Sequence, residues 1–235
     1  MLVVDTEALI KDRTLFSARG AGVLGMSIFG KSHFYLMDKD MKIKEDAFKE
    51  FLNRHQNERI LIFGFTFMVW EYLYEQFRGD GIDLSKAVLV HSGGWKKLIE
   101  KSVSNDIFKQ KLHDKFGLKD IYNFYGMVEQ VGSVFLECEK GYLHTPNFAD
   151  IIIRNQMDFS VCKTGEEGLI QVLSVLPRSY PGISLLTEDL GIVIGEDNCA
   201  CGRKGKYFNV LGRVKKAELR GCSDTFAFNS EALNS

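Results

Sequence analysis

The chain has 235 residues, enough for one large domain or for one domain with a smaller partner. Thirty basic and thirty-one acidic residues give a net charge of −1, so the chain lacks the basic surface that general DNA and RNA binders need. Hydrophobic residues at 45% and charged residues at 26% exclude a disordered chain and indicate a globular protein with a sizeable core.

The cysteines and the apolar segments bear on where the protein works. The five cysteines are an odd number scattered from Cys138 to Cys222, which argues against a secreted disulfide framework and for reduced thiols, free or metal-bound. The longest apolar run, residues 60–70, is too short to cross a bilayer. Residues 1–5 carry no basic leader of the kind that starts an export signal. We therefore expect a cytoplasmic protein without a membrane span.

The first half of the chain alternates between strand and helix patterns. Apolar periodicity predicts helices over residues 46–55, 67–77, 95–101 and 107–116, the last one stopped by Gly117. Buried strands are predicted over residues 59–66, 86–91 and 120–125. This alternation predicts the α/β class, with an open, mostly parallel sheet, flanking helices and right-handed crossovers.

The pattern changes after about residue 131. Short alternating segments separated by turns replace the helical periodicity, which predicts a smaller β-rich subdomain. We expect an α/β subdomain over residues 1–134, the β-rich subdomain over 135–212, and a hinge with a C-terminal tail over 213–235.

Two glycine motifs near the N-terminus fit nucleotide-binding patterns literally. Residues 20–25 fit G-x-G-x-x-G, but neither a preceding strand nor a following helix is evident, so we interpret them as a glycine-rich strand. Residues 25–32 fit the P-loop pattern G-x-x-x-x-G-K-S. A phosphate-binding loop must open a helix, whereas Ser32 runs into a strand-like segment. A P-loop nucleotide binder, dependent on Lys31, is kept as a minor alternative.

Three features distant in the sequence point to nucleotide chemistry. Gly93 and Gly94 follow a predicted buried strand, where ligands of open α/β sheets bind. Tyr125 ends the next predicted strand, offering a ring that can stack on a base, and Glu129 offers a carboxylate for Mg²⁺. Asp189, in the third feature, is suited to accept both hydroxyls of a ribose.

The order of these motifs resembles a known family. The motifs are HSGGWKKL (91–98), YGMVEQVG (125–132), LLTEDLG (185–191), CACGRKG (199–205) and GRVKKAELRGCSD (212–224). Together they are similar to the adenylate-forming enzymes, specifically the acyl-protein synthetases of bacterial bioluminescence, and more distantly to the phenylacetate–coenzyme A ligases. The resemblance covers residues 15–228 and implies a partial adenylate-forming fold.

The resemblance implies a role for each matching residue. Gly93 and Gly94 would line an adenine pocket together with Tyr125 and Gly126. Glu129 would hold Mg²⁺, Asp189 would bind the ribose, and Arg213 would be the arginine at the hinge. Val128 stands where the family has a threonine, and Glu188 where many relatives have glycine.

One family element has no counterpart here. Relatives carry a Ser/Thr/Gly-rich loop that grips the ATP phosphates, and this sequence contains none. We expect the chain to correspond to the C-terminal part of a longer enzyme. The alternative is a non-catalytic subunit or scaffold that keeps the fold without the loop.

Two further sets of cysteines have implied roles. Cys222 matches the cysteine that receives the acyl group as a thioester in the resembled synthetases. Cys138, His144, Cys199 and Cys201 form a Cys₃His set suited to a structural zinc ion, although their spacing departs from the usual one and unconnected groups stay an alternative. Some phenylacetate–coenzyme A ligase relatives look similar at these positions.

The resemblance implies an ATP-dependent ligase. A long-chain fatty acid would be activated as an acyl-adenylate, passed to the Cys222 thiol, and handed on to an acyl-accepting reductase partner. ATP and Mg²⁺ would be required, and no nucleic acid is expected as a partner.

Overall fold

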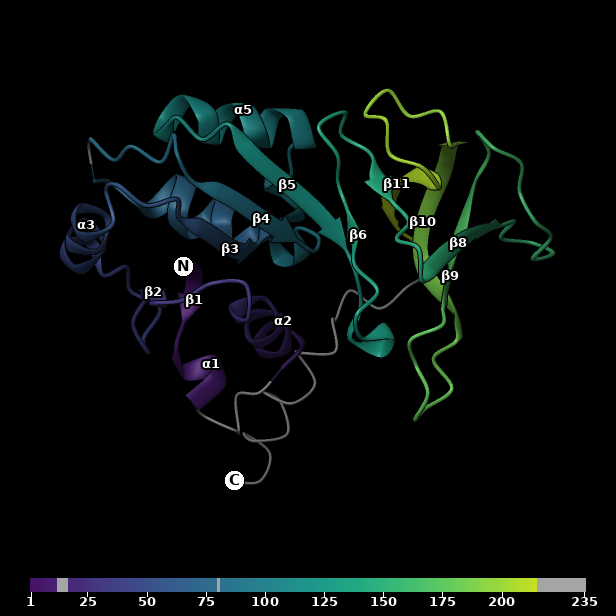
Figure 1. Ribbon diagram of the computed structural model, residues 1–235, viewed down its shortest axis with the longest axis horizontal. Helices are drawn as coiled ribbons and strands as arrows, with labels where there is room; N and C mark the ends of the chain where they lie inside the picture. Colours follow the sequence, from purple (N-terminus) through teal and green to yellow (C-terminus); the bar gives the residue numbers. More distant parts are fainter. Residues whose placement is uncertain (12–16, 80, 215–235) are drawn as a thin grey trace. The chain divides into compact units, whose positions relative to one another are not determined.

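A computed structural model describes residues 1–11, 17–79 and 81–214 (Figure 1). Within these residues the chain divides into two compact units, residues 1–121 and residues 122–214. Among the described helices, none combines the length and the apolar content needed to cross a bilayer. The expected boundary after residue 134 stays a prediction, and most of the expected hinge and tail lies outside the described residues.

The first unit is built on parallel strands. Their bounds are β1 (Leu2–Thr6), β2 (Phe34–Met37), β3 (Leu61–Phe65), β4 (Val88–Ser92) and β5 (Asp120–Tyr125), and β5 continues into the second unit. The sheet order is β2-β1-β3-β4-β5-β6. β1 pairs in parallel with both β2 and β3, and β3 pairs in parallel with β4. The predicted open parallel sheet is confirmed, although the sequence analysis did not identify β1.

Helices connect these strands. They are α1 (Ala8–Lys11), α2 (Ala18–Ser27), α3 (Glu45–Arg54), α4 (Thr66–Met68), the π-helix η2 (Val69–Gln76), the 3₁₀ helix η3 (Lys96–Lys101) and α5 (Asn105–Phe116). The four predicted helices are present within a few residues of their expected bounds. The 67–77 segment winds mainly as a π-helix, in which the Phe77 amide donates to the Tyr72 carbonyl five residues earlier.

Helices cover both faces of this sheet (Figure 1). On one face α3, η2 and α5 pack through aromatic rings: Phe48 contacts Phe77 at 5.5 Å between ring centroids, and Trp70 contacts Phe108 at 5.9 Å. On the other face α2 contacts β3. Gly22 makes that approach possible, because a Cβ there would lie 2.9 Å from the Phe65 ring. Because successive side chains of β3 point to opposite faces of the sheet, they can pack against the helices on both faces.

The glycine-rich segment 20–25 is a helix, and its interpretation as a strand was wrong. It forms most of α2, whose first turn is capped by the Ser17 hydroxyl accepting from the Gly20 amide. α2 ends at Ser27, and Ser32 leads through a short turn into β2. The P-loop alternative is therefore wrong as well, because no helix opens after Ser32 to present its amides to a phosphate.

The second unit is β-rich, as predicted. After η4 (Val128–Gln130), its strands are β6 (Phe135–Leu136), β7 (Leu143–His144), β8 (Ala149–Arg154), β9 (Glu167–Ser174), β10 (Ser184–Glu196) and β11 (Lys206–Arg213). Five of them form an antiparallel sheet in the order β7-β11-β10-β9-β8. β6 pairs instead with the end of β5. The buried side chains of this unit include Phe135, Ile151, Ile170, Val172 and Phe208.

Candidate functional site

Tyr125 and Glu129 lie at the carboxyl end of β5. Tyr125 is the last residue of the strand, and its ring packs against Phe135 and Phe208 in the core of the second unit. Gly126 follows, where a Cβ would lie 3.3 Å from the Ser133 carbonyl oxygen. Glu129 lies in η4 with an exposed side chain. An aromatic ring at the end of β5 and a carboxylate in the following η4 thus lie beyond the same end of the strand.

Asp189 meets Tyr125 from the other sheet of this unit. The Tyr125 hydroxyl donates to Asp189 Oδ2 at 2.7 Å, across 64 positions of sequence. Asp189 lies within the long strand β10, and its amide donates to the Thr187 hydroxyl at 3.1 Å. That hydroxyl in turn donates to the Ile170 carbonyl at 2.7 Å. The sequence indicated both Tyr125 and Asp189 as candidate site residues but did not predict the hydrogen bond between them.

Arg213 completes this group of charges. It pairs with Asp189 across β10 and β11, and its Nε lies 3.7 Å from Asp189 Oδ1. Its Nη2 donates to Glu188 Oε2 at 2.6 Å. The guanidinium is therefore shared between two neighbouring carboxylates, and Glu188, which stands where relatives have glycine, is an ion-pair partner of Arg213.

The Tyr125 hydroxyl keeps its proton. Burial raises the pKa of Tyr125 well above its usual range, and the neighbouring Asp189 carboxylate raises it further. A neutral phenol can donate to a carboxylate, so Tyr125 is the donor and Asp189 the acceptor at all physiological pH values. The arrangement presents one ordered carboxylate beside a guanidinium, which suits recognition of hydroxyl groups next to an anion.

Gly93 and Gly94 belong to the first unit, in the turn after β4. Both are exposed, and Gly93 has a φ of +81°, which favours glycine. Just before them, His91 is buried against the Phe108 ring. The Thr66 hydroxyl donates to the Ser92 carbonyl, so His91 Nδ1 must carry the ring proton and donate to Thr66 at 3.0 Å. This histidine is part of the core.

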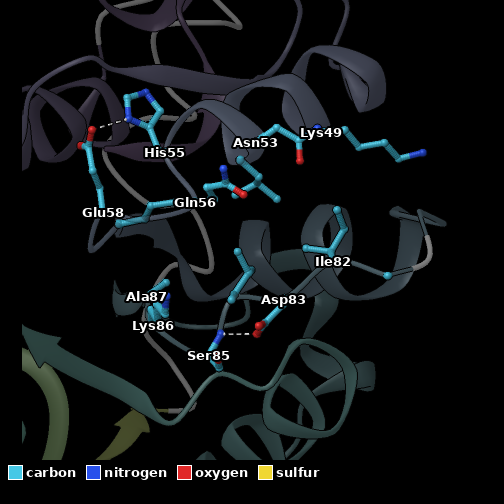
Figure 2. A pocket seen from close by; sticks show the side chains of 14 residues that line it. Lys49, Asn53, His55, Gln56, Glu58, Ile82, Asp83, Ser85, Lys86 and Ala87 are labelled. Atoms are coloured by element: carbon cyan, nitrogen blue, oxygen red, sulfur yellow. Dashed lines mark hydrogen bonds and ion pairs between the residues drawn. The ribbon is translucent and has the colours of Figure 1, made fainter.

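Two pockets lie in the first unit, and no predicted site residue lines either one. The first, about 390 Å³, lies between the end of α3 and residues 81–87, where His55 faces Glu58 (Figure 2). It opens at the amino ends of β3 and β4, whereas ligands of open α/β sheets bind beyond the carboxyl ends. The second, about 590 Å³, lies beside Thr6 and Met37 at the carboxyl ends of β1 and β2.

The four predicted metal ligands come together in the second unit. The Sγ atoms of Cys138, Cys199 and Cys201 and one ring nitrogen of His144 all lie within 4.8 Å of one another. Cys201 Sγ lies 3.4 Å from His144 Nε2. All but Cys201 are buried. A shared tetrahedral zinc ion would place its ligand atoms about 4 Å apart, so these donors fit the ion with small adjustments.

Two turns of the same kind present the thiols. Lys140 N donates to Cys138 Sγ and Arg203 N donates to Cys201 Sγ, each at 3.4 Å. Glycines with positive φ lie in both turns: Gly141, at +80°, donates its amide to the Cys138 carbonyl, and Gly202, at +83°, donates its amide to the Cys199 carbonyl. The turn after Cys138 was not predicted, although the spacing C-x-x-G from Cys138 to Gly141 was an available signal.

The electrostatics of this cluster suit a metal ion. Burial lowers the pKa of His144, helped by the charge of Arg203, so the imidazole is neutral and can act as a ligand. Burial raises the pKa of Cys199. At Cys201 burial also opposes ionisation, but the Arg203 amide and the neighbouring thiols outweigh it and lower the pKa.

Cys222, the predicted acyl acceptor, lies outside the described residues.

Comparisons with known proteins agree on one family. The family model for acyl-protein synthetase, LuxE, matches residues 3–232. The long-chain-fatty-acid–luciferin-component ligase of Vibrio harveyi is 28% identical over 171 residues, which are 68% of this chain and 41% of that protein. Its counterpart from Aliivibrio fischeri is 26% identical over 170 residues, 69% of this chain and 43% of that protein. The chain therefore spans less than half the length of the curated relatives it matches.

Solved structures share the fold at low sequence identity. A 2-hydroxyisobutyryl-CoA ligase bound to 2-HIB-AMP and CoA superposes with a TM-score of 0.66 at 16% identity, over 92% of this chain and 45% of that chain. ATP-bound MatB from Rhodopseudomonas palustris gives 0.57 at 13% identity, over 90% and 40%. These ligases support an adenylate-forming fold. Since the family model covers nearly the whole sequence, the chain belongs to the acyl-protein synthetase family, LuxE.

Proposed function

We propose that this chain carries the nucleoside-binding part of an acyl-protein synthetase, which uses ATP to activate a long-chain fatty acid and transfers the acyl group to a cysteine. The observation that carries the proposal is the hydrogen bond from Tyr125 to Asp189, with Arg213 beside it. The resemblance implies a nucleotide-binding role for Tyr125 and Asp189, and the hinge arginine for Arg213. The names of the two bacterial relatives support a fatty acid as the substrate.

In the first step the fatty-acid carboxylate attacks the α-phosphorus of ATP. A bond forms between a carboxylate oxygen and the α-phosphorus. The bond from the α-phosphorus to the oxygen that bridges to the β-phosphorus breaks, and pyrophosphate leaves with the electron pair of that bond. Asp189 would accept from the ribose hydroxyls, and Tyr125 would lie against the base. Arg213 would offset negative charge near the phosphates. A role for Gly93 and Gly94 in nucleotide binding stays a prediction.

Mg²⁺ is the expected metal of this step. A carboxylate oxygen is the ligand Mg²⁺ prefers, and the exposed Glu129 side chain would hold it together with phosphate oxygens and water. When bound, the ion neutralises phosphate charge.

In the second step the Cys222 thiolate attacks the acyl carbonyl of the adenylate. A carbon–sulfur bond forms, the carbon–oxygen bond to AMP breaks, and AMP leaves. The thiol proton goes to solvent or to a nearby base. The thioester would then be passed to a reductase partner.

We also propose that Cys138, His144, Cys199 and Cys201 hold a structural zinc ion. Four protein ligands leave no open position for a substrate, so the ion would brace the fold and take no part in the reaction. It would join the turn after β6 to the turn between β10 and β11, within the second unit.

The test is pyrophosphate release from ATP and a radiolabelled long-chain fatty acid, with covalent labelling of the protein measured in parallel. If the chain catalyses both reactions, Cys222→Ala should lose stable labelling but keep pyrophosphate release, and Asp189→Ala should lose both. Cys162→Ala, which changes a cysteine outside both proposed sites, should behave as the parent. Absence of pyrophosphate release from the folded parent would favour the alternative, a non-catalytic subunit that keeps the fold.

A further inference from the structure

We propose that the Tyr125 hydroxyl is a positioning group that makes the site specific for ribonucleotides over deoxyribonucleotides, by holding the Asp189 carboxylate in one orientation. The inference rests on the proposed function and adds a role for the hydroxyl, separate from the role of the ring at the base. It starts from the local structure around Asp189.

Asp189 occupies an irregular part of its strand. The pairing of β10 with β9 shifts register between Leu186 and Leu190, and the pairing with β11 shifts between Leu190 and Gly191. In regularly paired strands, the hydrogen bonds to neighbouring strands fix the direction of each side chain. Where the pairing is irregular, the side-chain direction is less well fixed. Here the Asp189 amide is fixed by the Thr187 hydroxyl. Its carboxylate therefore needs a contact of its own to be held in place.

The two oxygens of that carboxylate have different surroundings. Oδ2 accepts from the Tyr125 hydroxyl at 2.7 Å. Oδ1 faces Arg213 Nε at 3.7 Å, which is too long for a hydrogen bond. Within the described part of the chain, this leaves the lone pairs of Oδ1 to accept from a ligand. One oxygen that accepts from two neighbouring hydroxyls distinguishes a ribose from a sugar that lacks either one.

Tyr125 can impose this orientation because it is itself held in place. Its ring packs against Phe135 and Phe208, with centroid distances of 6.1 and 6.3 Å, so the hydroxyl projects from the apolar core. Without the hydroxyl, the carboxylate would turn toward Arg213 and solvent. We then expect Oδ1 to lose its fixed direction, and the two sugar hydroxyls to contribute less to binding.

The experiment measures the dissociation constants of ATP, 2′-deoxy-ATP and 3′-deoxy-ATP by calorimetry on the full chain. Hydrogen bonds to a charged group predict that the parent prefers ATP to each deoxy analogue by roughly tenfold or more. Tyr125→Phe keeps the ring and should reduce that preference to within about threefold. Tyr122→Phe, three residues earlier in β5 and so directed to the other face of the strand, should keep the parental preference.

The outcomes are distinguishable. A purely structural role for Tyr125 would weaken all three nucleotides equally and leave their ratio unchanged, and that result would overturn this inference alone. If the folded parent binds no ATP, both the inference and the proposed function fail. Asp189→Asn sets the reference for a site without the carboxylate, and the preference of Tyr125→Phe should approach that of Asp189→Asn.

Discussion

His91 is a neutral imidazole in the folded chain because its surroundings penalise the charged form. Burial, and to a lesser extent the positive charge of Lys109, lower the pKa of His91 to about 3. Its Nδ1 is satisfied by Thr66, while its Nε2 is buried without a hydrogen-bond partner among the described residues. In the unfolded chain the same side chain titrates near its ordinary pKa of about 6.5.

This difference predicts that the protein loses stability as the pH falls below about 6.5. In that range the unfolded chain binds a proton at His91 and the folded chain does not, so the free energy of unfolding decreases toward acid and is restored toward neutrality. The loss from His91 is about 1.4 kcal/mol for each pH unit well below 6.5. Urea unfolding at pH 7 and at pH 5 measures it, and about 2 kcal/mol should be lost.

The control is His91→Gln, which removes the titrating group but keeps a polar side chain near Thr66. It will be less stable than the parent at pH 7, with a smaller dependence on pH between 7 and 5. An identical pH dependence in the two proteins would show that His91 is not responsible.

At the residue scale, the sequence drew attention to Tyr125 and Asp189 but did not predict their contact. Tyr125 and Asp189 stood out because an aromatic residue and an acid at the ends of strands suit a nucleoside. Their hydrogen bond could not be predicted, because it depends on the register shifts in β10 and on the packing of one ring. The four members of the Cys₃His cluster were predictable from donor chemistry. That their donor atoms lie close together was not, because it depends on how the strands that carry them pair.

Among the elements, α5 is the one whose end the sequence defined best. It ends at Phe116, and Gly117 follows in the left-handed conformation with a φ of +71°, its amide bonded to the His113 carbonyl. We expect Gly117→Ala to lower the free energy of unfolding by about 1–2 kcal/mol, because alanine is strained at this φ. A Cβ there would also lie 3.3 Å from Ser85 Cβ. Chemical denaturation measures the loss.

Gly25→Ala is the matched control substitution, and we expect it to raise the free energy of unfolding and not to lower it. Gly25 lies inside α2, and a Cβ there would meet no atom within 4 Å. Alanine should stabilise this helix by about 0.5–1 kcal/mol. If both alanines changed stability in the same direction, backbone conformation would not be the cause.

α2 also shows why one element was misassigned. Three glycines within six residues give a low intrinsic preference for helix, and the segment was interpreted as a strand because no strand before it and no helix after it is evident in the sequence. Packing overrides that preference: the Ser17 cap starts the helix, and Gly22 lets it approach the Phe65 ring. The glycines that weakened the helical signal are what allow the helix to lie on the sheet.

At the scale of the whole molecule, the class of each half followed from sequence periodicity. Continuous apolar runs in the first half indicated buried parallel strands, and short alternating ones in the second indicated a β-rich subdomain, whose sheet is antiparallel. The order β2-β1-β3-β4-β5 was not predictable, because it depends on β1, whose residues are all buried and lack an alternating pattern. Strand order is a property of long-range pairing, which local patterns do not encode.

We expect the second unit to depend on the proposed zinc ion for stability. The Cys₃His cluster brings together the turn after β6 and the turn between β10 and β11, which are distant in the sequence. Because metal binding contributes directly to folding, we expect the purified chain to carry one zinc ion, and removal by a strong chelator to lower the melting temperature by about 10 °C. Cys199→Ser should reproduce the loss without a chelator. Cys162→Ser, which alters a half-buried cysteine outside the cluster, should keep both the zinc and the melting temperature, and a parent chain that is equally stable with and without zinc would refute the structural role.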